Sequence, residues 1–153
     1  AAASLSCRIV LMHAQGDPKT MQNDPNYVDV VTEVREFLAA RVATAETAGV
    51  DRARLIVDPG VGFGKTPAHN LALIDALPSI VDLGLPVLLG ASRKRFIAAL
   101  DRQGQASGRL GGSIAAAMVG AARGAAILRV HDVAATRQAL AVHAALEMAA
   151  SSR

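Results

Sequence analysis

The sequence predicts an α/β protein with a parallel sheet, and three observations favour this fold class. First, 52% of the 153 residues are apolar and 19% are charged, which fits a folded domain with a sizeable core. Second, short apolar runs alternate with longer helical segments. Third, these runs do not alternate strictly between apolar and polar residues, which is typical of parallel strands covered on both faces. We expect one domain over residues 1–153, without an internal boundary.

Four short apolar runs are the predicted strands, and a helical segment follows each of them. The runs span residues 7–12, 54–57, 86–89 and 126–130. Their recurrence every 30 to 50 residues or so is the rhythm of βα units.

Capping residues predict the boundaries of the first two helices. Asp24-Pro25 predicts the start of the first helix, and Gly49 predicts its end. Thr66-Pro67 repeats the same signal for the second helix, which Pro78 is expected to stop. Residues 79–84 are expected to form a short extra turn.

The second half of the chain is less regular between its strands. Residues 95–103 give no clear prediction, and the glycine-containing segment 104–112 is predicted as a loop. A helix is expected over 113–124. Asp132 is expected to cap a last helix that ends near Ala149.

Simple sequence features point to a cytoplasmic protein. The single cysteine, Cys7, cannot form an internal disulfide. We find no signal peptide, and no uncharged apolar run of about 18 residues that would span a membrane. The chain starts with Ala1-Ala2-Ala3 rather than Met, so we expect its natural beginning to lie upstream.

The charges are distributed unevenly and favour an anionic ligand. Residues 1–92 carry 7 Lys and Arg against 10 Asp and Glu, whereas residues 93–153 carry 9 against 3. The basic residues are scattered and lack an aromatic stacking platform, so we expect no nucleic acid partner. A small phosphorylated ligand fits better.

Polar residues gather directly after each predicted strand. They are His13 and Gln15, then Asp58, then Ser92, Arg93 and Lys94, then Arg129, His131 and Asp132. Because ligands bind at the carboxyl ends of parallel strands, these groups are expected to converge on one face. The alternative is that they are helix caps and loop residues. We interpret Asp132 as a cap only, and His13 fits a hydrogen-bonded core residue equally well.

The densest motif is the segment from Asp58 to Thr66. Its end resembles a phosphate-binding Walker A loop, but Pro59 stands where that motif needs glycine, so we exclude nucleotide triphosphate hydrolysis. Three alternating glycines allow a planar ligand to approach the backbone closely. A carboxylate such as Asp58 can accept two N–H bonds from an amino-pyrimidine edge, and Lys94 can donate to a heterocycle carbonyl.

Arg129 and His131 lie two residues apart, hence on the same side of an extended segment. Such a pair can hold a phosphate or diphosphate through charge-assisted hydrogen bonds. The sequence contains no Cys and His spacing typical of a metal site, and no Ser-His-Asp pattern.

Four motifs together resemble the dihydropteroate synthase family, in the same order along the chain. They are Leu11-Met12-His13-Ala14-Gln15-Gly16, the Asp58 to Thr66 segment, Ser92-Arg93-Lys94-Arg95-Phe96-Ile97 and Arg129-Val130-His131-Asp132-Val133. The resemblance implies a parallel (β/α)8 barrel of TIM type. Such a barrel needs about 250 residues, so this chain is expected to supply about four βα units, strands five to eight.

The resemblance also implies an activity in folate biosynthesis. The family condenses 6-hydroxymethyl-7,8-dihydropterin diphosphate with p-aminobenzoate, a reaction that sulfonamides inhibit by competition, and releases diphosphate. The implied site residues are Asp58, Lys94 and Met12 for the pterin, Arg129 and His131 for the diphosphate, and Phe63 and Ser92 for the p-aminobenzoate and sulfonamide region. Mg²⁺ is expected to neutralise the leaving diphosphate. Its ligand is expected in a missing N-terminal half, not in this chain, and the complete enzyme is expected to be a homodimer.

Two residues depart from the family pattern, and two alternative functions remain open. Ala14 stands where the family often has Met, and Arg95 stands where Ser is common. One alternative is another pterin-binding or phosphate-binding barrel enzyme. The other is a non-catalytic half-barrel that serves as a binding or assembly module. Because half of the barrel is lacking, the chain alone is not expected to be active.

Overall fold

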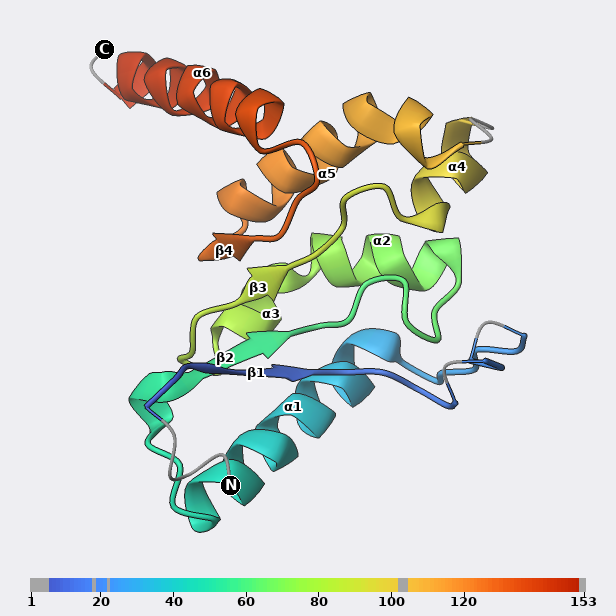
Figure 1. The fold of residues 1–153 in the computed structure, drawn as a ribbon. Coiled ribbons are helices and arrows are strands. Elements are labelled where there is room, and N and C mark those ends of the chain that lie inside the picture. Colours follow the sequence, from blue (N-terminus) through green and yellow to red (C-terminus); the bar gives the residue numbers. More distant parts are fainter. Residues whose placement is uncertain (1–5, 18, 22, 102–104, 152–153) are drawn as a thin grey trace.

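Four parallel strands and the helices that follow them make up the fold (Figure 1). The computed structural model describes residues 6–17, 19–21, 23–101 and 105–151. The strands are β1 (Ile9–Met12), β2 (Leu55–Asp58), β3 (Leu88–Leu89) and β4 (Ile127–Leu128). The helices are α1 (Val30–Thr47), α2 (Pro67–Asp75), α3 (Leu77–Val81), α4 (Arg95–Asp101), α5 (Leu110–Ala122) and α6 (Val133–Ser151), with 3₁₀ turns η2 (Arg52–Arg54) and η3 (Ala106–Arg109).

The strands lie side by side in sequence order, as two parallel pairs. β1 pairs with β2 in parallel from Ile9↔Leu55 to Met12↔Asp58, and β3 pairs with β4 in parallel. A parallel bridge between Val57 and Val87 joins the two pairs. β3 and β4 are shorter than the sequence predicts, because regular pairing covers two residues of each. The carboxyl ends of all four strands therefore point the same way.

The predicted start of α1 is wrong. The helix begins at Val30 rather than after Asp24-Pro25, because Asp29 is the residue that caps it. The Asp29 carboxylate accepts hydrogen bonds from the backbone N–H groups of Val31 (3.0 Å) and Thr32 (3.3 Å). These bonds satisfy two of the donors that a helix N-terminus leaves open.

The predicted start of α2 is confirmed. The Thr66 hydroxyl accepts from the His69 backbone N–H, and the His69 ring accepts from the Thr66 backbone N–H, which forms a reciprocal capping box. The helix ends at Asp75, ahead of the predicted stop, and Pro78 lies in the first turn of α3 instead. Proline is tolerated there, because the first helical N–H groups need no partner within the helix.

The region after β3 is more helical than predicted. Residues 95–101 form α4, and α5 begins at Leu110, so the predicted loop is wrong from Leu110 onward. Gly112 lies within α5 and packs closely against α4, since a β-carbon there would collide with Ile97. The glycine therefore serves close helix packing rather than a turn. The predicted loop start at Gly104 and the Ala1-Ala2-Ala3 start lie outside the described residues.

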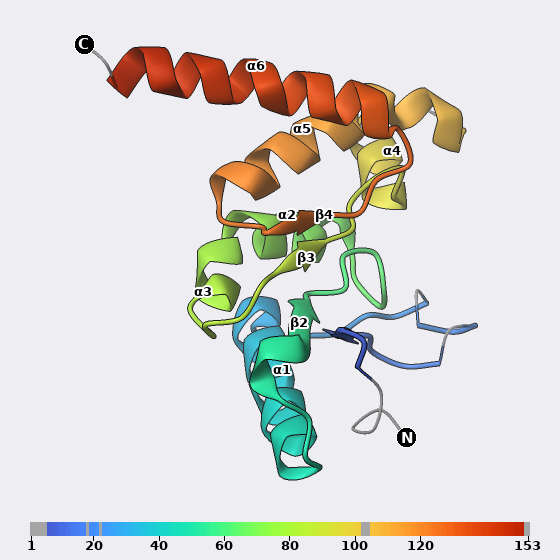
Figure 2. The same cartoon turned by 60° about the vertical axis from the view of Figure 1, so that its left-hand side comes forward.

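The main core lies between α1, the strands, α2 and α3. Its fully buried side chains include Val34, Leu38, Leu55, Val57, Leu73, Leu77 and Ile80. A smaller cluster surrounds Leu89 and Phe96 under α4. Figure 2 shows α1 at one end of the molecule and α6 at the other, beyond α5. Within the described ranges, no helix is both long enough and apolar enough to cross a lipid bilayer.

Candidate functional site

Asp58 lies at the centre of the candidate site. It is the last residue of β2, and its side chain is only 1% exposed. Oδ1 accepts a hydrogen bond from the Gly60 backbone N–H (2.8 Å), and Oδ2 lies 3.5 Å from the Arg129 guanidinium. Burial raises the pKa of Asp58, against the opposing effect of the Gly60 N–H and three nearby cations. Those cations are Arg129, Lys94 and Lys65.

Three cations around one carboxylate give this part of the site an excess of positive charge. Such an excess attracts an anion, while the carboxylate remains available to a ligand that offers N–H donors. The arrangement therefore suits a ligand with an N–H-rich edge and a negatively charged group.

Arg129 reaches Asp58 across the end of β3. A β-carbon at Gly90 would lie 2.7 Å from Nη2 and 3.1 Å from Nε of Arg129. The absence of a side chain at Gly90 thus allows the guanidinium to extend from the end of β4 toward β2. The Arg129 side chain remains 56% exposed, so a ligand can reach it.

Lys94 lies over the ring of Phe63, with Nζ 4.0 Å from the ring centroid. This is a cation–π distance. A β-carbon at Gly62 would come within 2.9 Å of the Lys94 side chain, and Gly62 also has a φ of 81°, which favours glycine. Burial and the neighbouring Arg129 lower the pKa of Lys94, and Asp58 raises it.

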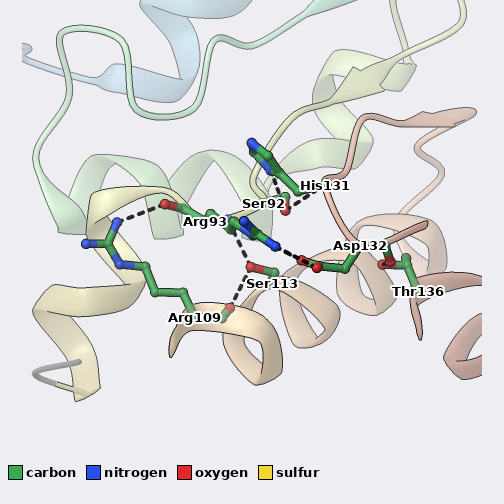
Figure 3. Close-up of polar contacts among 7 residues, drawn as sticks. All are labelled: Ser92, Arg93, Arg109, Ser113, His131, Asp132 and Thr136. Carbon is green, nitrogen blue, oxygen red and sulfur yellow. Dashed lines mark hydrogen bonds and ion pairs between the residues drawn. The ribbon is translucent and has the colours of Figure 1, made fainter. Parts of the chain in front are cut away.

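His131 and Ser92 form a second group at the ends of β4 and β3. The Ser92 hydroxyl, buried at the end of its strand, lies 3.0 Å from His131 Nδ1 and accepts from the His131 backbone N–H at 3.3 Å (Figure 3). Met12 lies at the end of β1, where it pairs with Asp58 in the strand register. The structure thus places each sequence-predicted residue at a strand end or in the loop that follows.

The sequence analysis missed a buried pair near Asp58, formed by Lys65 and His13. Lys65 is 3% exposed, and its Nζ lies 2.8 Å from His13 Nδ1 and donates to the Phe63 carbonyl at 2.9 Å. Burial lowers the pKa of Lys65 to about 8, although Asp58 raises it. Burial also lowers the pKa of His13 to about 4, with Lys65 adding to the effect, so the neutral ring accepts from the ammonium.

A signal for Lys65 was present in the sequence. The lysine follows three alternating glycines in a loop that starts with Asp58, a carboxylate directly after an apolar run. A buried carboxylate calls for nearby cations.

A groove of about 770 Å³ lies elsewhere, between α2, α4 and α5. Its lining is mostly apolar, with Leu71, Phe96 and Leu100 among its members. It contains none of the sequence-predicted site residues. The chemistry-bearing side chains therefore gather at the strand ends and not in this groove.

The described residues do not fit a divalent cation. Among them, no three His, Cys, Asp or Glu side chains group closely enough to hold a metal ion. The carboxylate at the site centre, Asp58, has three cations around it, which disfavours a further cation there. We therefore derive no chemical step through Mg²⁺ from this chain.

Comparison with known proteins places these motifs in context. Residues 1–131 match the family described as "Pterin binding enzyme". The dihydropteroate synthase of Neisseria meningitidis serogroup B is 51% identical over 141 residues, covering 90% of this chain and 50% of that protein.

Solved dihydropteroate synthases share the fold. The Xanthomonas albilineans enzyme is 47% identical, and the comparison covers 95% of this chain and 53% of that chain. Its TM-score is 0.89 for the complex with 7,8-dihydropteroate and 0.87 for the complex with 4-aminobenzoic acid. The Yersinia pestis enzyme in complex with a sulfonamide drug has a TM-score of 0.88 at 39% identity, covering 93% of this chain and 52% of that chain. This chain spans about half the length of the relatives that it matches.

Proposed function

Because this chain belongs to the pterin-binding enzyme family, we propose that it forms the C-terminal half of a dihydropteroate synthase. In this proposal it supplies strands five to eight of a TIM-type barrel, and residues 1–153 are one structural unit. The complete enzyme condenses 6-hydroxymethyl-7,8-dihydropterin diphosphate with p-aminobenzoate and releases diphosphate. Four adjacent parallel strands, each followed by a helix, support this assignment.

The observation that carries the proposal is the buried carboxylate of Asp58 among three cations. A carboxylate at this depth is costly unless a ligand or a cation satisfies it. An amino-pyrimidine edge offers two N–H donors to one carboxylate, so the pterin edge satisfies Asp58. Lys94 donates to the oxo group on the same heterocycle, and Met12 lies against it as an apolar wall.

Arg129 and His131 hold the diphosphate in this proposal. Both occur where the chain leaves β4, and Arg129 already lies in the positive region around Asp58. A guanidinium and an imidazole donate charge-assisted hydrogen bonds to phosphate oxygens. Phe63 and Ser92 border the p-aminobenzoate and sulfonamide region.

The reaction needs a carbon–oxygen bond to break before or while a carbon–nitrogen bond forms. The electron pair of the pterin methylene–oxygen bond leaves with the diphosphate, and the arylamine nitrogen then attacks the cation-like carbon and loses a proton. Arg129 and His131 stabilise the charge that develops on the leaving group, since they are positioned before the reaction begins. Asp58 and Lys94 hold the heterocycle in place during the displacement.

Three further features complete the proposal. Residues outside this sequence would hold Mg²⁺, which would supply charge neutralisation for the diphosphate. The complete enzyme is a homodimer. It acts in the cytoplasm on small-molecule substrates, without a nucleic acid or membrane partner.

A hybrid synthase tests the proposal. In this hybrid, residues 1–153 follow the N-terminal half of the Neisseria meningitidis serogroup B relative and replace its matching half. We expect release of diphosphate only when both the pterin diphosphate and p-aminobenzoate are present. Asp58→Asn should reduce this turnover strongly, and Glu46→Gln, in an exposed ion pair with Arg52, serves as the matched control. Turnover without p-aminobenzoate, or none at all, would contradict the proposal. Pterin binding without turnover would favour the non-catalytic alternative.

A further inference from the structure

Arg93 joins two loops of the candidate site, the loop after β3 and the loop after β4. Its Nη2 and Nε donate to the two carboxylate oxygens of Asp132, at 2.7 and 3.1 Å (Figure 3). The bond is a two-point fork between the loop after β3 and the loop after β4, 39 residues apart. Such a fork fixes orientation as well as distance. The sequence analysis listed Arg93 among the polar residues after its strand and interpreted Asp132 as a helix cap only, whereas the Asp132 carboxylate binds Arg93.

The backbone of Arg93 is held in an unusual conformation. Its φ is 57°, the one positive value at a non-glycine position among the described residues. The Arg93 N–H donates to the Ser113 hydroxyl (2.9 Å), and its carbonyl accepts from the Arg109 guanidinium (2.8 Å). Ser113 in turn donates to the Arg109 carbonyl (2.6 Å). A residue in the left-handed region persists when its surroundings hold it from several sides, and such residues concentrate at functional sites.

This turn sends consecutive side chains to different partners. Ser92 contacts His131, Arg93 contacts Asp132, and Lys94 lies over Phe63 on the loop after β2. The Arg93–Asp132 fork is therefore one residue away from Lys94 on one loop and one residue away from His131 on the other. The side chains at both ends of the fork are about one-third and one-quarter exposed, so the pair lies at the edge of the site rather than in the core.

We propose that Arg93 and Asp132 are positioning residues that fix the distance between the pterin-binding and diphosphate-binding parts of the site. The fork keeps Lys94 and His131 in one relative arrangement, so a single ligand can contact both loops at once. This inference rests on the proposed function, because it needs Lys94 to face the pterin and His131 to face the diphosphate.

The role predicts a difference between a linked ligand and its two fragments. Each loop alone still binds its own fragment when the fork is broken. The linked pterin diphosphate loses affinity, since it profits from two subsites only while their separation matches its length. A misplacement of about 1 Å can cost on the order of 100-fold in such a site.

The experiment measures dissociation constants by calorimetry for three probes on the hybrid synthase. The probes are 6-hydroxymethylpterin, inorganic diphosphate and the linked pterin diphosphate. Asp132→Asn keeps the shape of the side chain but removes its charge. Arg93→Asn removes the fork but tolerates the left-handed backbone, and it leaves the backbone bonds to Ser113 and Arg109 in place. Glu46→Gln breaks the exposed Arg52–Glu46 pair and is the matched control.

We expect both fork variants to bind the linked compound about 10- to 100-fold more weakly, with little change for either fragment. The control should bind all three probes as the parent does. Equal losses for fragments and linked compound would show that the fork supports folding alone and would overturn the inference, as would unchanged binding of all three. Failure of the parent hybrid to bind either fragment would instead contradict the proposed function, and the inference with it.

Discussion

The two ends of the molecule are packed very differently. At one end, α1 buries an apolar stripe against the strands, composed of Val30, Val34, Leu38 and Val42. At the other end, α6 packs against α5 and leaves most of its large apolar side chains exposed. These are Val133, Val142, Leu146 and Met148. The comparison teaches that the first βα units complete their own core, whereas α6 leaves large apolar side chains exposed on more than one side of the helix.

An exposed apolar side chain also lies at the opposite edge of the sheet, in β1. Val10 in β1 is 44% exposed, whereas Val57 and Leu88 in the inner strands are buried. In the complete barrel, further strands and helices would cover both β1 and α6. At about 25 cal/mol per Å², burying a few hundred Å² of such surface would contribute several kcal/mol. This free energy is comparable with the net free energy of unfolding of a domain.

The largest effect that separates the two ends is expected from alanine substitutions in helices α1 and α6. Leu38→Ala in α1 should lower the free energy of unfolding by about 2–5 kcal/mol, because Leu38 is fully buried and leaves a cavity. Leu146→Ala in α6 should change it by no more than about 0.5 kcal/mol in the 153-residue chain, since this side chain is 64% exposed. Urea unfolding followed by circular dichroism measures both. Equal losses in dilute, monomeric protein would mean that Leu146 is buried.

Acid should destabilise the packed end through His13. The folded pKa of His13 is about 4 and its ordinary value is 6.5, so the unfolded chain binds more protons between these pH values. The free energy of unfolding should therefore fall as pH drops from about 6.5 to 4. His13→Gln should flatten this part of the pH profile of thermal unfolding. A slope that persists in the variant would exclude His13 as its cause.

Lys65 should act at the alkaline end of the same profile. Its folded pKa of about 8 lies below its ordinary value of 10.5, so the unfolded chain again binds more protons between the two. Stability contributed by this group should rise as pH increases from about 8 to 10.5. Lys65→Met, compared with the parent by thermal unfolding over this range, should lose that rise.

Within the site, residues from the packed side and from the open side should affect different ligands. Asp58→Asn, on β2, should weaken pterin binding to the hybrid synthase by roughly 1–3 kcal/mol, because an acceptor becomes a donor that faces N–H groups. Arg129→Ala, at the end of β4, should spare pterin affinity and weaken binding of the diphosphate ester. Calorimetry with both compounds distinguishes the two. Equal losses for both compounds in both variants would contradict this division.

The smallest effect is expected at Gly90, between these two sides. Gly90→Ala should displace the flexible Arg129 side chain with little loss of stability, because the added β-carbon meets the end of that side chain. Affinity for the diphosphate ester should fall by about 1 kcal/mol, the usual value of one lost hydrogen bond. Gly111→Ala, where a β-carbon meets no atom within 4 Å, is the matched control. Unchanged ester affinity in Gly90→Ala would show that Arg129 can bind the ester without the space that Gly90 leaves over the end of β3.

The sequence predicted those features that depend on neighbouring residues. The four strands, the Thr66-Pro67 start of α2 and the placement of Asp58 and Lys94 after their strands all follow from local patterns. The start of α1 was misjudged, because Asp24-Pro25 and Asp29 both carry a capping signal and only the fold selects Asp29.

Features that depend on distant contacts were missed. The Arg93–Asp132 fork joins residues 39 apart, and the Lys65–His13 pair joins residues 52 apart. The close contact between Gly112 of α5 and Ile97 of α4 is another such feature, which a glycine-rich segment alone does not reveal. In each case the local sequence favours a simpler interpretation, such as a helix cap or a loop. The contact that the structure shows depends on residues far apart in the sequence.

The most direct test of the account compares the 153-residue chain alone with the chain supplied with the N-terminal half of the Neisseria meningitidis serogroup B relative, in trans or fused. Size-exclusion chromatography and a turnover assay with pterin diphosphate and p-aminobenzoate measure both states. We predict that the chain alone is self-associated or partly unfolded and inactive, since Val10 at the β1 edge and several large apolar side chains of α6 are exposed. The added half should restore both solubility and turnover. A stable, active monomer of 153 residues would contradict the account.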